Sequence, residues 1–207
     1  MSVDAEADEP AGKPPANLWE QLRADPLRAP EYIALAASEN HAPAAARWAD
    51  RRRRVFGTHP KLLGEMARRR HATLASVEGA ATGVGGIVTL IPDLVGLAWI
   101  QSRMVFFIAA AYGFDPRDRM RPAELLVING LYSDVPSARA ALDGIGTTIE
   151  RGREQAMMSR LLRFVGKRTA NRAARRLIPG VAIAFNAIAN ERDTRSLADK
   201  AIRFYGG

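Results

Sequence analysis

Residues 79–113 read GAATGVGGIVTLIPDLVGLAWIQSRMVFFIAAAYG, and this stretch decides the fold class. Glycine and alanine fill its first part, and the rest is almost wholly apolar apart from Asp93, Gln101 and Arg103. A soluble core helix rarely holds so many glycines, and a simple membrane span rarely holds a central carboxylate. The pattern predicts tight helix packing in or against a membrane, and it indicates no particular reaction.

Gly79, Gly83 and Gly86 are spaced four and three residues apart, which places them on one side of a helix. Gly79 and Gly83 form a GxxxG pair, which lets two helix backbones approach closely and is common in membrane helix pairs. A close helix crossing inside a soluble core would use the same pattern. A nucleotide-binding loop is not expected, because no Gly-Lys-Ser/Thr follows and Val88 stands where a dinucleotide fingerprint needs its third glycine.

Asp93, Gln101 and Tyr112 lie on the predicted apolar helix, and Asn186 lies in a later apolar segment. Asp93 falls in the first turn, where the helix dipole stabilises a carboxylate by up to about 1 kcal/mol. Gln101 and Tyr112 are eleven residues apart, about three turns, and therefore share a face. Since an unpaired buried polar group costs about 1–3 kcal/mol, we expect Asn186 to be a partner for them. A polar bridge between two buried helices fits these residues better than a catalytic set.

The rest of the chain predicts an all-α fold, a compact multi-helix bundle with Gly-rich, closely packed apolar central helices. Proline is well tolerated in a first helical turn, so each proline is expected to open a helix, and no segment alternates as a strand does. Residues 1–16 are expected to be a disordered acidic tail, residues 17–56 an N-terminal helical extension and residues 57–207 the main helical domain. The expected helices cover residues 30–40, 43–56, 60–78 (continuing towards 90), 92–113, 122–131, 137–150, 153–176, 179–190 and 192–205.

The chain is basic, with a net charge of +8, and without the acidic tail the remainder carries +11. Such a charge attracts phosphates, although an arginine- and alanine-rich composition is also typical of a GC-rich genome. Nucleic-acid binding is not expected, because no helix-turn-helix, zinc ligand set or aromatic-studded strand accompanies the charge. The absence of cysteine excludes disulfides and thiolate chemistry.

Residues 160–176 hold seven cations and no acid, and they lead directly into an apolar run. A basic helix beside an apolar one is typical of proteins that lie on anionic lipid, at about 1 kcal/mol per cation near the surface; a merely solvated face is the alternative. A second basic cluster, residues 51–54 with Arg47, Lys61 and residues 68–70, precedes the Gly-rich stretch. The expected lipid contacts are Arg163, Lys167, Arg168, Arg172, Arg175 and Arg176.

No catalytic motif is present. His41, His59 and His71 are the three histidines, none belongs to an HExxH motif, and we expect all three at the surface. The sequence predicts a protein without catalytic, cofactor-binding or metal-binding residues, while an enzyme with an unrecognised buried polar site stays an alternative. The N-terminus lacks an apolar leader and no uncharged stretch reaches 18 residues, so we expect a cytoplasmic protein that is peripheral or shallowly inserted at the inner face of the cell membrane.

The order of the Gly-rich entry, Pro92-Asp93, Gln101, Tyr112-Gly113 and the late Pro-Gly…Asn186 segment resembles the EcsC family of bacterial proteins, over residues 61–205. That family takes its name from a protein encoded beside an ATP-binding-cassette transporter. The resemblance implies a membrane-associated helical protein with an accessory or regulatory role in transport or secretion, a protein partner in a membrane complex, and no catalytic residues. A soluble helical adaptor that binds a protein partner is the alternative.

Overall fold

The computed structural model describes residues 12–81, 90–144 and 182–207, and this part of the chain confirms the predicted all-α fold. The side chains of residues 76–81, 90, 91, 93 and 182–191 are not described. The helix predicted over residues 153–176 lies outside the described residues. The elements are α1 Ala16–Ala24, the short 3-10 helix η2 Pro26–Arg28, α2 Ala29–Phe56, α3 Pro60–Ala81, α4 Leu90–Ala111, α5 Arg121–Ile128, α6 Val135–Asp143 and α9 Ala182–Gly206.

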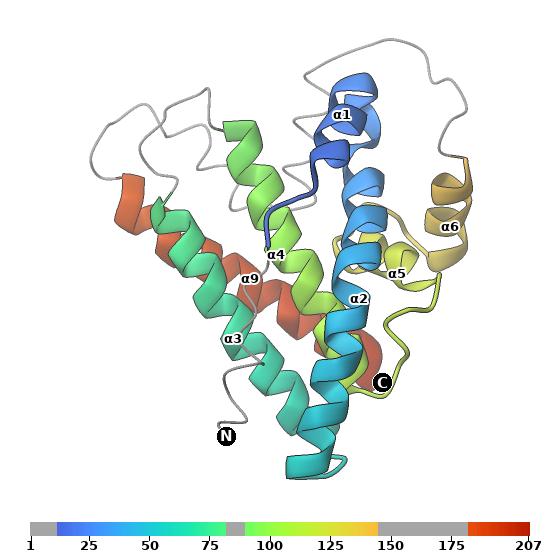
Figure 1. The fold of residues 1–207 in the computed structure, drawn as a ribbon, viewed down its shortest axis with the longest axis vertical. Coiled ribbons are helices and arrows are strands. Elements are labelled where there is room, and N and C mark those ends of the chain that lie inside the picture. The colour runs from blue at the N-terminus through green and yellow to red at the C-terminus, as the bar shows by residue number, and fades with distance from the viewer. Residues whose placement is uncertain (1–11, 82–89, 145–181) are drawn as a thin grey trace.

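Helix α4 lies at the centre of the bundle (Figure 1), where it packs against α2, α3 and α9. Helices α2 and α3 meet at a short turn and form a V around α4, and α9 runs along α3 and crosses α4. Helices α5 and α6 pack on the other side of α2, and α1 lies along the N-terminal part of α2. The segment predicted to be central therefore has neighbours on three sides.

Burial explains the composition of α4. Among the described helices, α4 is the one that is long and apolar enough to cross a membrane, with a mean hydropathy of 1.6 over Leu94–Ala111. However, 94% of that window is buried by the rest of the chain. A helix that is apolar all round needs cover on every side, and here other helices of the same chain supply it. This helix is the core of the bundle.

The N-terminal helices belong to the same core. Helix α2 is rich in alanine, whose small side chains let it pack closely on α4, and it also buries Ile33 and Trp48. Leu18 and Leu22 of α1 join the same cluster of buried side chains. The segment predicted as an N-terminal extension, residues 17–56, therefore forms one wall of the core.

Several predicted helix boundaries are wrong. Helix α5 ends at Ile128 and α6 at Asp143, where helices to residues 131 and 150 were expected. Pro43 was expected to open a helix but lies inside α2. It removes the hydrogen bond to the carbonyl of Glu39, but Glu39 is exposed, so water can solvate that carbonyl, and the buried face continues through Ala45 and Trp48. A break at residues 190–192 was also expected, yet α9 is continuous, because no proline or glycine interrupts it before Gly206.

Helix α4 ends just before Gly113, the glycine predicted to stop it. Gly113 has φ +92°, a left-handed conformation that glycine adopts without strain. Its N–H donates to the carbonyl of Ala110 at 3.1 Å, and the N–H of Phe114 donates to the carbonyl of Ala109 at 3.1 Å. This pattern satisfies the last carbonyls of the helix. The start of α4 is at Leu90, two residues before Pro92.

Candidate functional site

Gln101 lies on the buried side of α4 and has 1% exposure. Its Nε2 donates to Oγ1 of Thr194 on α9 at 3.4 Å, a long hydrogen bond, and its Oε1 has no hydrogen-bond partner among the described residues. A polar contact therefore connects the two helices as expected, but it uses Thr194. The side chain of Asn186, the partner that the sequence suggested, lies outside the described residues.

Tyr112 does not join Gln101 in one site. Its ring lies between α3 and α9, where a methyl group added at Gly64 would be 2.8 Å from Cε2 and one added at Gly206 would be 3.1 Å from Cε1. Burial raises the pKa of the Tyr112 hydroxyl. Tyr112 thus fills a gap that two glycines leave open, and its role in this arrangement is packing.

The other predicted site residues are placed only in part. Asp93 belongs to α4, three residues after Leu90, and its side chain is not described. Gly79 lies near the end of α3, while Gly83 and Gly86 lie outside the described residues. The six predicted lipid contacts also lie outside them: Arg163, Lys167, Arg168, Arg172, Arg175 and Arg176.

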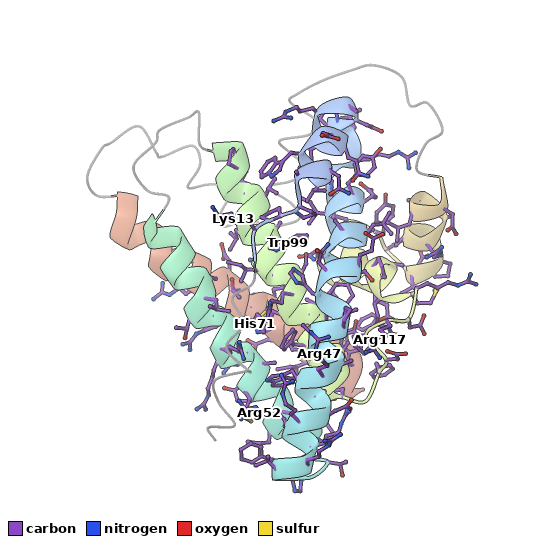
Figure 2. All side chains as sticks on the ribbon, in the orientation of Figure 1. Lys13, Arg47, Arg52, His71, Trp99 and Arg117 are labelled. Atoms are coloured by element: carbon purple, nitrogen blue, oxygen red, sulfur yellow. The ribbon has the colours of Figure 1, made fainter. Side chains whose placement is uncertain are left out.

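The prediction that all histidines lie at the surface is wrong for two of the three. His59 is exposed, but His41 and His71 are 2% and 0% exposed. His41 packs its ring edge-on against Trp99 at 4.4 Å, and His71 packs against Phe107 at 4.9 Å. Figure 2 shows Trp99 and His71 pointing into the space between the helices. The missed signal is spacing, because each histidine stands four residues from buried alanines on both sides.

Both buried histidines are neutral. Burial, followed by the nearby Arg103 charge, lowers the pKa of His41 to about 3. Burial is also the main reason that the pKa of His71 is lowered to about 3. Nδ1 of His71 lies 2.8 Å from the carbonyl of Ala67, which can only accept, so Nδ1 carries the proton and Nε2 is the unprotonated nitrogen.

Arg103 is the buried cation beside the two histidines. It is 4% exposed, and its guanidinium lies 4.9 Å from the centre of the Phe107 ring. Trp99, Arg103 and Phe107 are spaced four residues apart, so they form one stripe of α4 that faces the two histidines. Among the described residues, no group of three or more histidines and carboxylates could hold a metal ion. The cluster is suited to fixing three helices together.

A second buried polar cluster connects α5 to α9. Arg121 donates to Oε2 of Glu124, and the Tyr205 hydroxyl donates to the same oxygen at 2.8 Å. The Arg121 guanidinium also lies 5.2 Å from the Phe114 ring centre. Burial raises the pKa of Glu124, against the opposing effects of Tyr205 and Arg121, and burial raises the pKa of Tyr205 well above its usual range. Sequence reasoning missed this cluster because Tyr205 is 81 residues from Glu124 along the chain.

The exposed apolar side chains gather at one end of the bundle. We call this the basal end, where α2, α4 and α9 end and α3 begins. Two sets of contacts join these termini: Arg53 of α2 donates to the carbonyl of Ala110 of α4, and Tyr112 lies against Gly64 and Gly206. Among the described residues, the large hydrophobic side chains that are well exposed all belong to the segments that meet there: Val55, Phe56, Leu62, Phe114 and Phe204.

The most prominent part of the basal end is the α2–α3 tip, residues 51–62, at the lower end of the molecule in Figure 1. Val55, Phe56 and Leu62 are 57%, 39% and 46% exposed there. Residues 51–64 carry five cations and no acid. The Arg52 guanidinium lies 5.9 Å from the centre of the Phe56 ring, so charge and apolar surface adjoin (Figure 2).

The profile of the EcsC protein family matches residues 58–206. The chain belongs to the EcsC family. This match confirms the resemblance seen in the sequence, and it covers α3, α4, α5, α6 and α9. Helices α1 and α2 precede the matched residues.

Among curated proteins, the chain is similar to the uncharacterized protein YdbA of Bacillus subtilis (strain 168), with 42% identity over 45 residues. That alignment covers 22% of this chain and 16% of YdbA, a small part of the relative's length. No solved structure matches the chain significantly. The comparisons therefore assign the family.

Proposed function

We propose that this EcsC-family protein is a non-enzymatic, membrane-associated helical protein that acts at the cytoplasmic face of the membrane as an accessory or regulatory factor of a transport or secretion system. The observation that carries the proposal is the basal end, where exposed apolar side chains adjoin a run of cations. Monomeric soluble proteins rarely gather apolar side chains in this way without a binding role. Apolar side chains among cations suit the boundary between lipid headgroups and acyl chains.

The experiment is flotation of the purified chain with vesicles of phosphatidylcholine alone and of phosphatidylcholine mixed with phosphatidylglycerol. We expect binding to the anionic vesicles that weakens with salt, because headgroup charge attracts the cations and salt screens that attraction. A chain that stays unbound with both vesicles in low salt would contradict the proposal.

A soluble adaptor is the second candidate, and the burial of α4 favours it. The segment most like a membrane span is 94% covered by the chain itself, so the fold does not need lipid to hide its most apolar helix. On this account the basal end binds a protein partner. Failure of flotation together with a monodisperse, detergent-free chain would support this candidate.

A further inference from the structure

We propose that the α2–α3 tip docks on the surface of an anionic phospholipid bilayer, with Val55, Phe56 and Leu62 entering the headgroup layer and the bundle standing on its basal end. This inference rests on the proposed membrane association, and it adds the surface, the lipid class and the orientation. The sequence analysis had pointed to residues 160–176 for this contact. Substitutions confined to the tip therefore distinguish the two candidate contacts.

The tip carries a surplus of positive charge, because residues 50–64 hold five cations and one acid. The acids that flank residues 51–64 are Asp50 and Glu65. Asp50 is paired with Arg53 at 3.4 Å, and Glu65 is held by Arg68 at 2.6 Å and by Arg69 at 2.8 Å. The arginines beside Glu65 lower its pKa to about 2, so it stays ionised and paired. The tip therefore keeps a net positive charge, which complements phosphate headgroups.

The tip is fixed in place by contacts within the chain. Helix α2 is closed by Gly57 at φ +70°, whose N–H donates to the carbonyl of Arg53 at 2.8 Å. Arg53 in turn donates to the carbonyl of Ala110 near the C-terminal end of α4. Leu63 is fully buried while Leu62 points outward, so the start of α3 is fixed in register. A surface that is already ordered loses little conformational entropy on binding.

The other exposed part of the basal end carries less positive charge. Phe114 and Phe204 are each 42% exposed, but both rings pack on Tyr205 at 5.1 Å. The loop of residues 114–120 contains two acids and two arginines, whose charges cancel, and Arg203 is the one cation beside Phe204. This C-terminal corner exposes two aromatic side chains with a smaller positive charge than the tip. It provides matched control variants for the tip.

The charge test compares two triple substitutions in the full chain. Replacing Arg52, Arg54 and Lys61 by Ser should lower the partition coefficient on phosphatidylglycerol vesicles by about 100-fold, at about fivefold lost per cation. The control removes the same charge from exposed positions outside the tip, namely Arg117, Arg119 and Arg203 (Arg117 is labelled in Figure 2). Screening makes distant charges count for little, so we expect the control to bind within about threefold of the unaltered chain.

The insertion test uses salt-screened conditions, in which apolar contact dominates. Replacing Val55, Phe56 and Leu62 by Ser should lower binding by roughly tenfold or more, while Phe114→Ser with Phe204→Ser should leave it unchanged. If the unaltered chain binds and the tip variants bind equally well, the tip is not the docking surface and membrane association survives on another surface. If the unaltered chain binds neither vesicle, the proposed function itself fails. Tip substitutions that abolish binding to a protein partner but do not change binding to vesicles would also overturn the inference.

Discussion

Helix α4 and the α2–α3 tip are two apolar regions with opposite surroundings. The Leu94–Ala111 window of α4 would satisfy a test for a membrane span, yet it is 94% buried within the chain. The tip is far less apolar, since four consecutive arginines precede Val55 and Phe56, but its apolar side chains face solvent. Hydropathy measures how much apolar surface a segment has, while the fold decides which of that surface remains available to lipid.

Phe107→Ala should destabilise the core around α4. Phe107 is 1% exposed and packs on Trp48 at 5.3 Å and on His71 at 4.9 Å, so its removal should lower the free energy of unfolding by about 3–5 kcal/mol in urea denaturation. Vesicle binding of the folded variant should not change. As the control, Phe204→Ala at an exposed site should cost less than about 0.5 kcal/mol. Weakened vesicle binding by Phe107→Ala with little loss of stability would mean that α4 meets lipid.

Acid should destabilise the core through His41 and His71. Both histidines have a pKa of about 3 in the folded chain, against 6.5 for an ordinary solvated histidine, so the unfolded chain binds more protons once the pH falls below 6.5. Stability should be constant above pH 6.5 and should decline below it, by up to about 1.4 kcal/mol per pH unit for each histidine. Below the ordinary glutamate pKa of 4.5, Glu65, with its pKa of about 2, adds a loss of the same sign.

The measurement is the free energy of unfolding against pH, by urea denaturation. His41→Asn and His71→Asn should each remove about one proton from the slope between pH 6 and pH 5. A stability that does not change between these two values would contradict the burial of both rings. The alanines four residues to either side of each histidine could have predicted this burial. The position of Arg103 beside the histidines could not be predicted, because Arg103 lies on a different helix.

Gly64→Ala should have an intermediate effect. The added methyl group would lie 2.8 Å from Cε2 of Tyr112, so we expect a loss of about 1–3 kcal/mol in urea denaturation. Gly206→Ala, with a closest approach of 3.1 Å, should cost less. A Tyr112→Leu background should reduce the penalty of Gly64→Ala, and equal penalties in both backgrounds would show that the ring is not what fills the gap.

The triple serine variant of Val55, Phe56 and Leu62 should have the smallest effect on stability. Its side chains are exposed, so the free energy of unfolding should change by less than about 0.5 kcal/mol for each substitution. Circular dichroism and urea denaturation of the same protein used for flotation provide the measurement. A large loss of stability would show that these side chains serve the core, and the contrast with α4 would disappear.

The sequence predicted what depends on local pattern. The all-α class, the central apolar helix and the glycine stop at Gly113 follow from composition and periodicity, and the structure has all three. Pro43 was misplaced because burial of the α2 face outweighs one lost hydrogen bond. The fit of Tyr112 between Gly64 and Gly206 joins three distant segments, so no local pattern reveals it. The tip was visible only as a basic cluster, since the exposure of Val55, Phe56 and Leu62 depends on the fold.

The most direct test places one label on each side of the proposed membrane boundary. The chain has no cysteine, so Thr58→Cys in the tip and Ser196→Cys in the middle of α9, both at exposed positions, each give a single site for a polarity-sensitive fluorophore. With phosphatidylglycerol vesicles, we predict a blue shift and shielding from an aqueous quencher at position 58, and neither change at position 196. A label at position 58 that stays in water while the chain is bound would contradict the account.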